Sequence, residues 1–123
     1  MTTTTATIAG KSVTLAYCYA TEIAFKDLSD QDINDFMPAV GESLSANRMP
    51  DIKSTLYLIL ASITAYYSAK EQDPPIKYSD IMTDATPEEL GNALGSVLTL
   101  RGQFYHLPAG EQTDQQKEDS SKN

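Results

Sequence analysis

Three residues near the N-terminus, Gly10-Lys11-Ser12, match the end of a phosphate-binding loop. In that motif, a glycine five positions before the Gly-Lys pair lets backbone N–H groups surround the phosphates, and a helix follows. Here the earlier position is Thr5, and the residues after Ser12 alternate in polarity as in a β-strand. The sequence therefore favours a hairpin turn over a nucleotide site.

The stretch DQDIND places oxygen ligands at the spacing of a calcium loop. Asp30, Asp32 and Asn34 occupy the first, third and fifth ligand positions. The sixth position must be glycine and the twelfth a bidentate glutamate, but this chain has Asp35 and Gly41 there. An amphipathic helix with an acidic first turn explains the segment better than a calcium site.

The other side chains that could take part in catalysis or metal binding have no suitable partner residue in the sequence pattern. Cys18, expected on a strand, cannot form an internal disulfide, which agrees with a reducing compartment. The only histidine, His106, lies far along the chain and has no second metal ligand at a usual spacing. Glu88 and Glu89 are adjacent and so do not face each other on a helix. No catalytic set emerges, and we expect a protein that is not an enzyme and uses no metal or cofactor.

The charge balance points to protein partners. Seventeen acidic residues against nine basic residues give a net charge of −8, which repels nucleic acid and anionic membranes. No apolar run reaches the roughly 18 residues that span a bilayer. The first residues, MTTTTAT, lack the basic flank and apolar core of a signal peptide, so we expect a cytoplasmic protein.

The patterns predict an α+β protein, mainly α, in which an N-terminal β-hairpin packs on a bundle of about four helices. One globular domain is expected over residues 1–108, followed by a disordered acidic tail over 109–123. The expected elements are a hairpin at 4–19 and helices at about 20–28, 30–40, 50–71 and 86–105, with a further short helix starting at Ser79.

In the hairpin, one face of the second strand carries Val13, Leu15, Tyr17 and Tyr19. The first helix is expected to turn Ile23, Ala24 and Leu28 toward the core. The second helix should begin with Ser29 as its N-cap residue, end at Gly41 and use the core face Ile33, Phe36, Met37 and Val40.

The helix at 50–71 is expected at the centre of the fold, with Pro50 in its first position and Asp51 near its positive end. It has a broad apolar stripe, and its other face is mostly small. The stripe consists of Ile52, Leu56, Ile59, Leu60, Ile63, Tyr66 and Tyr67. The small face consists of Ser54, Leu58, Ala61, Ala65, Ser68 and Ala69.

The last helix has a compact start signal, with Thr86 as N-cap, Pro87 in the first position and Glu89 completing a capping box. Its core face is Leu90, Leu94, Val97 and Leu98. Gly91 and Gly95 predict the close approach of a neighbouring helix or the hairpin, with a subunit contact as the alternative.

Some apolar residues exceed the needs of these core faces. If they are exposed, they mark a site for a partner or for self-association, and otherwise they are ordinary core. The candidate partner-binding residues are Tyr66, Tyr67, Leu100, Phe104, Tyr105 and Leu107. For Tyr66 and Tyr67 the core interpretation is favoured.

The order of elements resembles a known family. A hairpin of the form Ile8-x-Gly10-Lys11-Ser12-Val13-x-Leu15-x-Tyr17 precedes ATEIAFKDLS, an apolar helix, IKYSDIMTDATPEEL and a final amphipathic helix. Over residues 4–107 this pattern is similar to the tail assembly chaperones of long-tailed bacteriophages, which are often encoded in prophages. The hairpin with ATEIAF.DL is its most specific part.

The resemblance implies a small acidic protein in the cytoplasm of the bacterial host cell. Such chaperones bind the aggregation-prone tape-measure protein, help recruit tail-tube protein and leave the finished particle, and many also have a longer frameshifted form. Two other function classes stay open. One is a structural subunit of a phage tail or another multi-subunit assembly, and the other is an enzyme or small-ligand binder, which would require a pocket with convergent polar groups.

Overall fold

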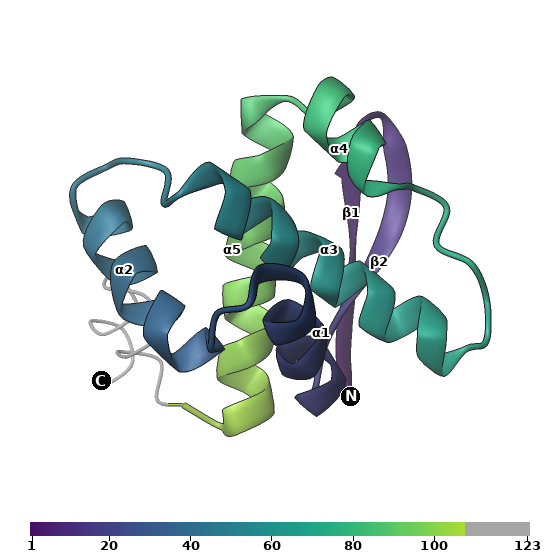
Figure 1. The fold of residues 1–123 in the computed structure, drawn as a ribbon, viewed down its shortest axis with the longest axis horizontal. Helices are drawn as coiled ribbons and strands as arrows, with labels where there is room; N and C mark the ends of the chain where they lie inside the picture. The colour runs from purple at the N-terminus through teal and green to yellow at the C-terminus, as the bar shows by residue number, and fades with distance from the viewer. Residues whose placement is uncertain (108–123) are drawn as a thin grey trace, which may run out of the picture.

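The chain opens with two antiparallel strands, β1 (Thr2–Ile8) and β2 (Lys11–Tyr17), which pair along their whole length (Figure 1). Ala9 and Gly10 form the turn between them, with φ angles of 52° and 77°. Two consecutive positive φ angles give a turn whose twist matches that of the strands, and glycine adopts such an angle at no steric cost. The predicted hairpin is confirmed, and Gly10 serves the turn.

Within residues 1–107, five helices follow the hairpin. They are α1 (Tyr19–Ser29), α2 (Ile33–Ser45), α3 (Ile52–Ala69), α4 (Tyr78–Asp84) and α5 (Pro87–Tyr105). The fold is α+β and mainly α, as the sequence predicts. This computed structural model describes residues 1–107, so the tail expected over 109–123 lies outside the described residues.

Helix α3 lies at the centre of the fold, as predicted. It contacts β2, α1, α4 and α5 (Figure 1). Leu58 and Ala61 on its small face are buried, and so are Ile59 and Ile63 on its apolar stripe. Burying both sides of one helix fixes the positions of the elements around it.

The prediction that the strand continues through Cys18 and Tyr19 is wrong. The hydroxyl of Thr21 donates a hydrogen bond to the carbonyl of Ala16 (2.9 Å) and accepts one from the N–H of Cys18 (3.2 Å). These bonds end the strand at Tyr17 and make Cys18 the N-cap residue of α1.

The predicted core face of α1 is wrong for two of its three residues, and only Ala24 packs partly against the core. Thr21 and Phe25 are its buried residues, whereas Ile23 and Leu28 are exposed. The bond from buried Thr21 to the strand sets the rotation of the helix, and the ring of Phe25 then stacks on Phe36 of α2 with centroids 5.4 Å apart. The outer side of α1 is therefore left with apolar side chains in water.

Helix α2 begins later and ends later than predicted. Asp32, not Ser29, is its N-cap residue, because the Asp32 carboxylate accepts a hydrogen bond from the N–H of Asn34 (2.8 Å). The helix continues through Gly41 to its end at Ser45. Its predicted core face is confirmed for three residues, namely Ile33, Phe36 and Val40, while Met37 is half-buried.

The start of α3 also differs from the prediction. Pro50 is buried before the helix, and Asp51 is the N-cap residue, accepting from the N–H of Ser54 (3.0 Å). Ile52 consequently lies in the first turn and is exposed. The side-chain cap at Asp51 makes Ile52 the first helical residue, two positions after Pro50.

Helix α5 starts as predicted, with Thr86 as N-cap and Glu89 closing the capping box. The predicted close approach at Gly91 and Gly95 is wrong within this chain. A Cβ atom added at either position would meet no other atom within 4 Å, because both residues lie on the exposed side of the helix.

Candidate partner-binding site

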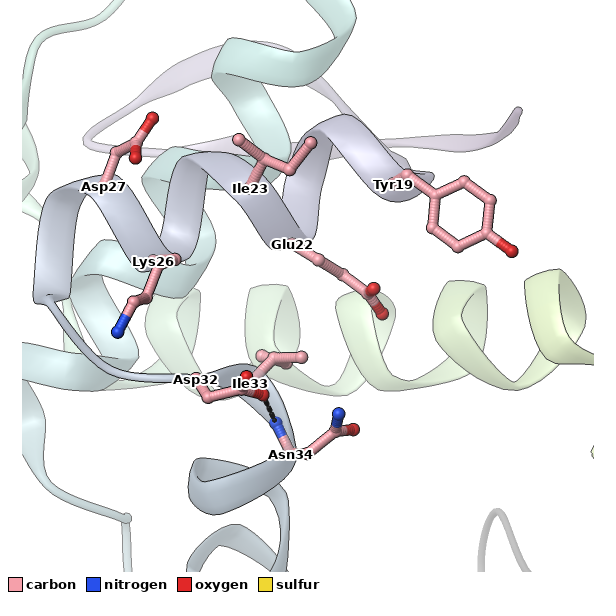
Figure 2. Close-up of a pocket in the computed structure, with 8 residues that line it drawn as sticks. All are labelled: Tyr19, Glu22, Ile23, Lys26, Asp27, Asp32, Ile33 and Asn34. Carbon is pink, nitrogen blue, oxygen red and sulfur yellow. Dashed lines mark hydrogen bonds between the residues drawn. The ribbon is translucent and has the colours of Figure 1, made fainter.

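An open cleft of about 450 Å³ lies between α1 and the start of α2 (Figure 2). Two of its residues, Tyr19 and Ile23, are large apolar side chains that are 65% and 63% exposed. They lie one turn apart on α1 and therefore share one face of the helix. The remaining residues of the cleft are Glu22, Lys26, Asp27, Asp32, Ile33 and Asn34.

The cleft is acidic. Glu22, Asp27 and Asp32 contribute three carboxylates to its lining, against the single ammonium of Lys26. Lys26 also lies 3.9 Å from the carboxylate of Asp30, an exposed pair that contributes little to stability. The combination of apolar side chains and negative charge suits a partner segment that is apolar on one face and basic at its flanks.

Glu22 joins the cleft to the C-terminal end of α5. One of its carboxylate oxygens accepts hydrogen bonds from the hydroxyls of Tyr17 (2.8 Å) and Tyr105 (2.5 Å). Burial, and then the bond to Glu22, raises the pKa of Tyr17 above its usual value and that of Tyr105 to about 12. Both phenols therefore stay protonated at neutral pH and act as donors to the carboxylate.

Aromatic rings continue this surface. Phe104 packs against Tyr17, Tyr19 and Tyr105, with ring centroids 5.8, 5.1 and 4.9 Å apart respectively. The guanidinium of Arg101 lies over the ring of Tyr105, 5.4 Å from its centroid. The exposed ring of Tyr19 thus rests on a fixed aromatic base, which lowers the entropy lost when a partner covers it.

The structure brings only some of the candidate partner-binding residues to this surface. Phe104 and Tyr105 adjoin the cleft, and half-buried Leu107 follows them, its N–H donating to the carbonyl of Gly102 (2.9 Å). Leu100 is 3% exposed and belongs to the core. A partner could not reach it without opening the fold.

Tyr66 and Tyr67 lie elsewhere, near the end of α3. Their rings meet edge to face with centroids 4.9 Å apart, and both residues are half-buried. The Tyr67 hydroxyl accepts a hydrogen bond from the N–H of Thr14 in β2 (3.2 Å), and Lys70 lies over the ring of Tyr66. Tyr67 therefore has a structural role in holding α3 against the hairpin.

Sequence reasoning missed Tyr19, Glu22 and Ile23 as site residues. The available signal was the spacing of Tyr19 and Ile23, which places both on the same face of α1 as Glu22 and Lys26. Only the rotation imposed by Thr21 shows that this face points to solvent.

The other candidate sites have local structural roles. Lys11 begins β2 and reaches the carbonyl of Pro75 (3.4 Å), and Asp32 caps α2. His106 is the exposed residue with positive φ (57°) that ends α5. Among residues 1–107, no three His, Cys, Asp or Glu side chains are grouped as metal ligands would be.

Searches against protein-family models, curated proteins and solved structures found no match to this chain. None of the helices in the described part of the chain has the length and apolar character needed to cross a membrane.

Proposed function

We propose that this protein is a non-catalytic tail assembly chaperone of long-tailed bacteriophages, acting in the cytoplasm of the bacterial host cell. It binds the tape-measure protein and aids assembly of the tail tube. The resemblance of the hairpin and the ATEIAFKDLS stretch supports this function. The structural observation that carries it is the pair of exposed side chains, Tyr19 and Ile23, on the open cleft between α1 and α2.

A chaperone of this kind must cover apolar helical segments before they meet one another. An amphipathic helix binds such a surface by laying its apolar face against aromatic and aliphatic anchors. Tyr19 and Ile23 supply these anchors, and Glu22, Asp27 and Asp32 can attract Lys or Arg side chains at the edges of the bound helix. No covalent chemistry is required of any residue in the cleft.

The direct test is co-expression with a tape-measure protein of a long-tailed phage, chosen from the phage that encodes this chain, followed by co-purification. We expect the wild-type chain to keep the tape-measure protein soluble and to elute with it. Ile23→Glu should abolish both effects, because it places a charge where an apolar face must pack. Met82→Glu is the matched control, since Met82 is 56% exposed on α4, outside the cleft.

Equal co-purification with Ile23→Glu and Met82→Glu would overturn the proposed site. No co-purification of the wild-type chain, with the protein instead present in purified phage particles, would replace the chaperone function with that of a structural subunit.

A further inference from the structure

The outer edge of β1 carries unpaired backbone groups. In an antiparallel pair, the N–H and C=O groups of alternate residues point toward and away from the partner strand. The N–H of Thr14 in β2 points away from β1, because it donates to the hydroxyl of Tyr67. Thr14 pairs with Thr5, so Thr5 also directs its backbone groups away from the hairpin. Thr3 and Thr7, two residues to either side, do the same.

The geometry of the turn shows independently that the backbone groups of Thr7 point away from β2. A two-residue turn is closed by hydrogen bonding between the residues that flank it, here Ile8 and Lys11. Ile8 therefore points its backbone groups toward β2, and its neighbour Thr7 points them outward.

Within residues 1–107, the two outer edges of the hairpin differ in whether their backbone groups have hydrogen-bond partners. On the outer edge of β2, Tyr67 bonds the N–H of Thr14 and Thr21 bonds the carbonyl of Ala16. On the outer edge of β1, within residues 1–107, the backbone groups of Thr3, Thr5 and Thr7 have no hydrogen-bond partner, and their side chains are exposed.

The strand β1 itself has none of the sequence features that usually protect an edge strand. Natural edge strands avoid unwanted pairing by being very short, by carrying lysine or proline, or by a bulge. β1 has seven residues, TTTTATI, without a charge or a proline, and its pairing with β2 is regular. Threonine also favours the extended conformation.

The distribution of charged side chains favours a second copy of this chain as the strand that pairs with the outer edge of β1. The chain has a net charge of −8, so most contacts between two copies would oppose like charges. Residues 1–10 carry no charged side chain, and neither do residues 90–100 of the adjacent α5. The hydroxyl of Thr2 bonds the carbonyl of Leu100 (3.2 Å), which shows that this part of α5 runs beside β1.

We propose that two copies of this chain associate through β1, forming a continuous four-stranded antiparallel sheet with the two-fold axis at Thr5. Thr5 then pairs with Thr5 of the second copy, and Thr3 pairs with Thr7. Each of these pairs uses the outward N–H and C=O groups on both strands, giving about six new hydrogen bonds. Threonine side chains also stand opposite one another, which is a favourable cross-strand pairing. The edge shares no residue with the α1–α2 cleft, so this association goes beyond the proposed function and does not depend on it.

The test compares two double variants by sedimentation over a range of protein concentrations. Thr3→Lys with Thr7→Lys puts lysine opposite lysine in this register, and should weaken the dimer at least about tenfold. Thr3→Lys with Thr7→Glu puts lysine opposite glutamate and should keep the dimer. The first variant also lowers the net negative charge, so general repulsion cannot explain its loss of association. Ser12→Lys, on the same exposed face but on β2, is the matched control and should associate like the wild type.

Circular dichroism establishes that each variant is folded. The amide N–H groups of Thr3, Thr5 and Thr7 should also exchange more slowly in the wild-type protein as its concentration rises. The proposal is overturned if the wild type is a monomer at every concentration, or if it forms a dimer that both double variants retain equally. Protection of these amides by a different protein, and not by raising the concentration of this one, would likewise replace the second copy as the bound strand.

Discussion

The hairpin with α3 and α5 differs from the region of α1 and α2 in how it uses the same kinds of side chain. In the first region the hydroxyl of Tyr67 accepts a hydrogen bond from a backbone N–H of β2, and Leu58 is fully buried. In the second, Tyr19 and Ile23 lie in water on a helix whose buried face is narrow. The residues that stabilise the fold and the residues that we propose for partner binding therefore lie in separate parts of this small protein, and substitutions should affect one property without the other.

The largest expected effect is on the packed region. Leu58→Ala removes a fully buried side chain at the centre of α3 and should lower the free energy of unfolding by about 3 kcal/mol. Urea denaturation measures this value. Ile23→Ala on the exposed face is the comparison and should change stability by less than about 0.5 kcal/mol. Equal losses at the two positions would contradict the division between the regions.

The second prediction concerns the hydrogen bonds that connect the hairpin turn to α5. The Glu89 carboxylate accepts hydrogen bonds from the N–H groups of Thr86 (3.0 Å), Ala9 (2.9 Å) and Gly10 (3.2 Å). The bond from the N–H of Thr86 has the largest effect and lowers the pKa of Glu89 from its usual 4.5. Desolvation opposes this shift, and the bonds from Ala9 and Gly10 then lower the pKa further.

Because the folded state lowers this pKa, the stabilisation is complete above about pH 4.5 and is lost as the pH falls through the lowered value. Glu89→Gln should therefore be less stable than the wild type at pH 7, although its loss of stability should be smaller than that of Leu58→Ala. The difference in stability between Glu89→Gln and the wild type should narrow in acid. Thermal unfolding between pH 2 and 7 measures this difference. Glu88→Gln, which alters the exposed neighbouring residue, is the control, and a gap independent of pH would contradict the role of the carboxylate.

The packed region also contains a residue whose replacement should stabilise it. Ser62 is buried in α3, and its hydroxyl has no hydrogen-bond partner in the described part of the protein. Ser62→Ala removes an unsatisfied polar group and adds a better helix former, so it should raise the free energy of unfolding by roughly 1 kcal/mol. A loss of stability in urea would show that the hydroxyl is paired.

The smallest effect lies where the two regions meet. Tyr105→Phe removes one of the two hydroxyls bonded to Glu22 and should cost about 0.5 kcal/mol. The folded state raises the pKa of Tyr105 to about 12. The hydroxyl of Tyr105 therefore stabilises the fold below about pH 10, and this stabilisation is lost as the pH rises toward 12. The variant should accordingly show a shallower loss of stability above pH 10, and an unchanged alkaline profile would contradict the bond.

Local signals in the sequence predicted much of the packed region. The capping box at Thr86 and Glu89, the turn at Gly10 and the apolar stripe of α3 depend on near neighbours. All of them occur in the structure, except that Ile52 of the stripe is exposed. The orientation of α1 depends on the bond from Thr21 to Ala16, where the pattern of apolar residues favoured Ile23 instead.

For the same reason, the candidate site was only partly predictable. Phe104 and Tyr105 were identified as excess aromatic residues, but their position beside Glu22 depends on contacts between segments about 80 residues apart. The bonds from Glu89 to the hairpin turn are equally distant in sequence. Such contacts leave no periodic pattern that a single sequence could display.

The measurement that tests the central claim most directly is hydrogen exchange of this chain with and without the tape-measure protein. The account predicts slower exchange over residues 19–34, which include the cleft, and unchanged exchange over α4, which carries the exposed control residue Met82. Protection confined to α4 or to the end of α3, or no protection anywhere under conditions where the wild-type complex forms, would contradict it.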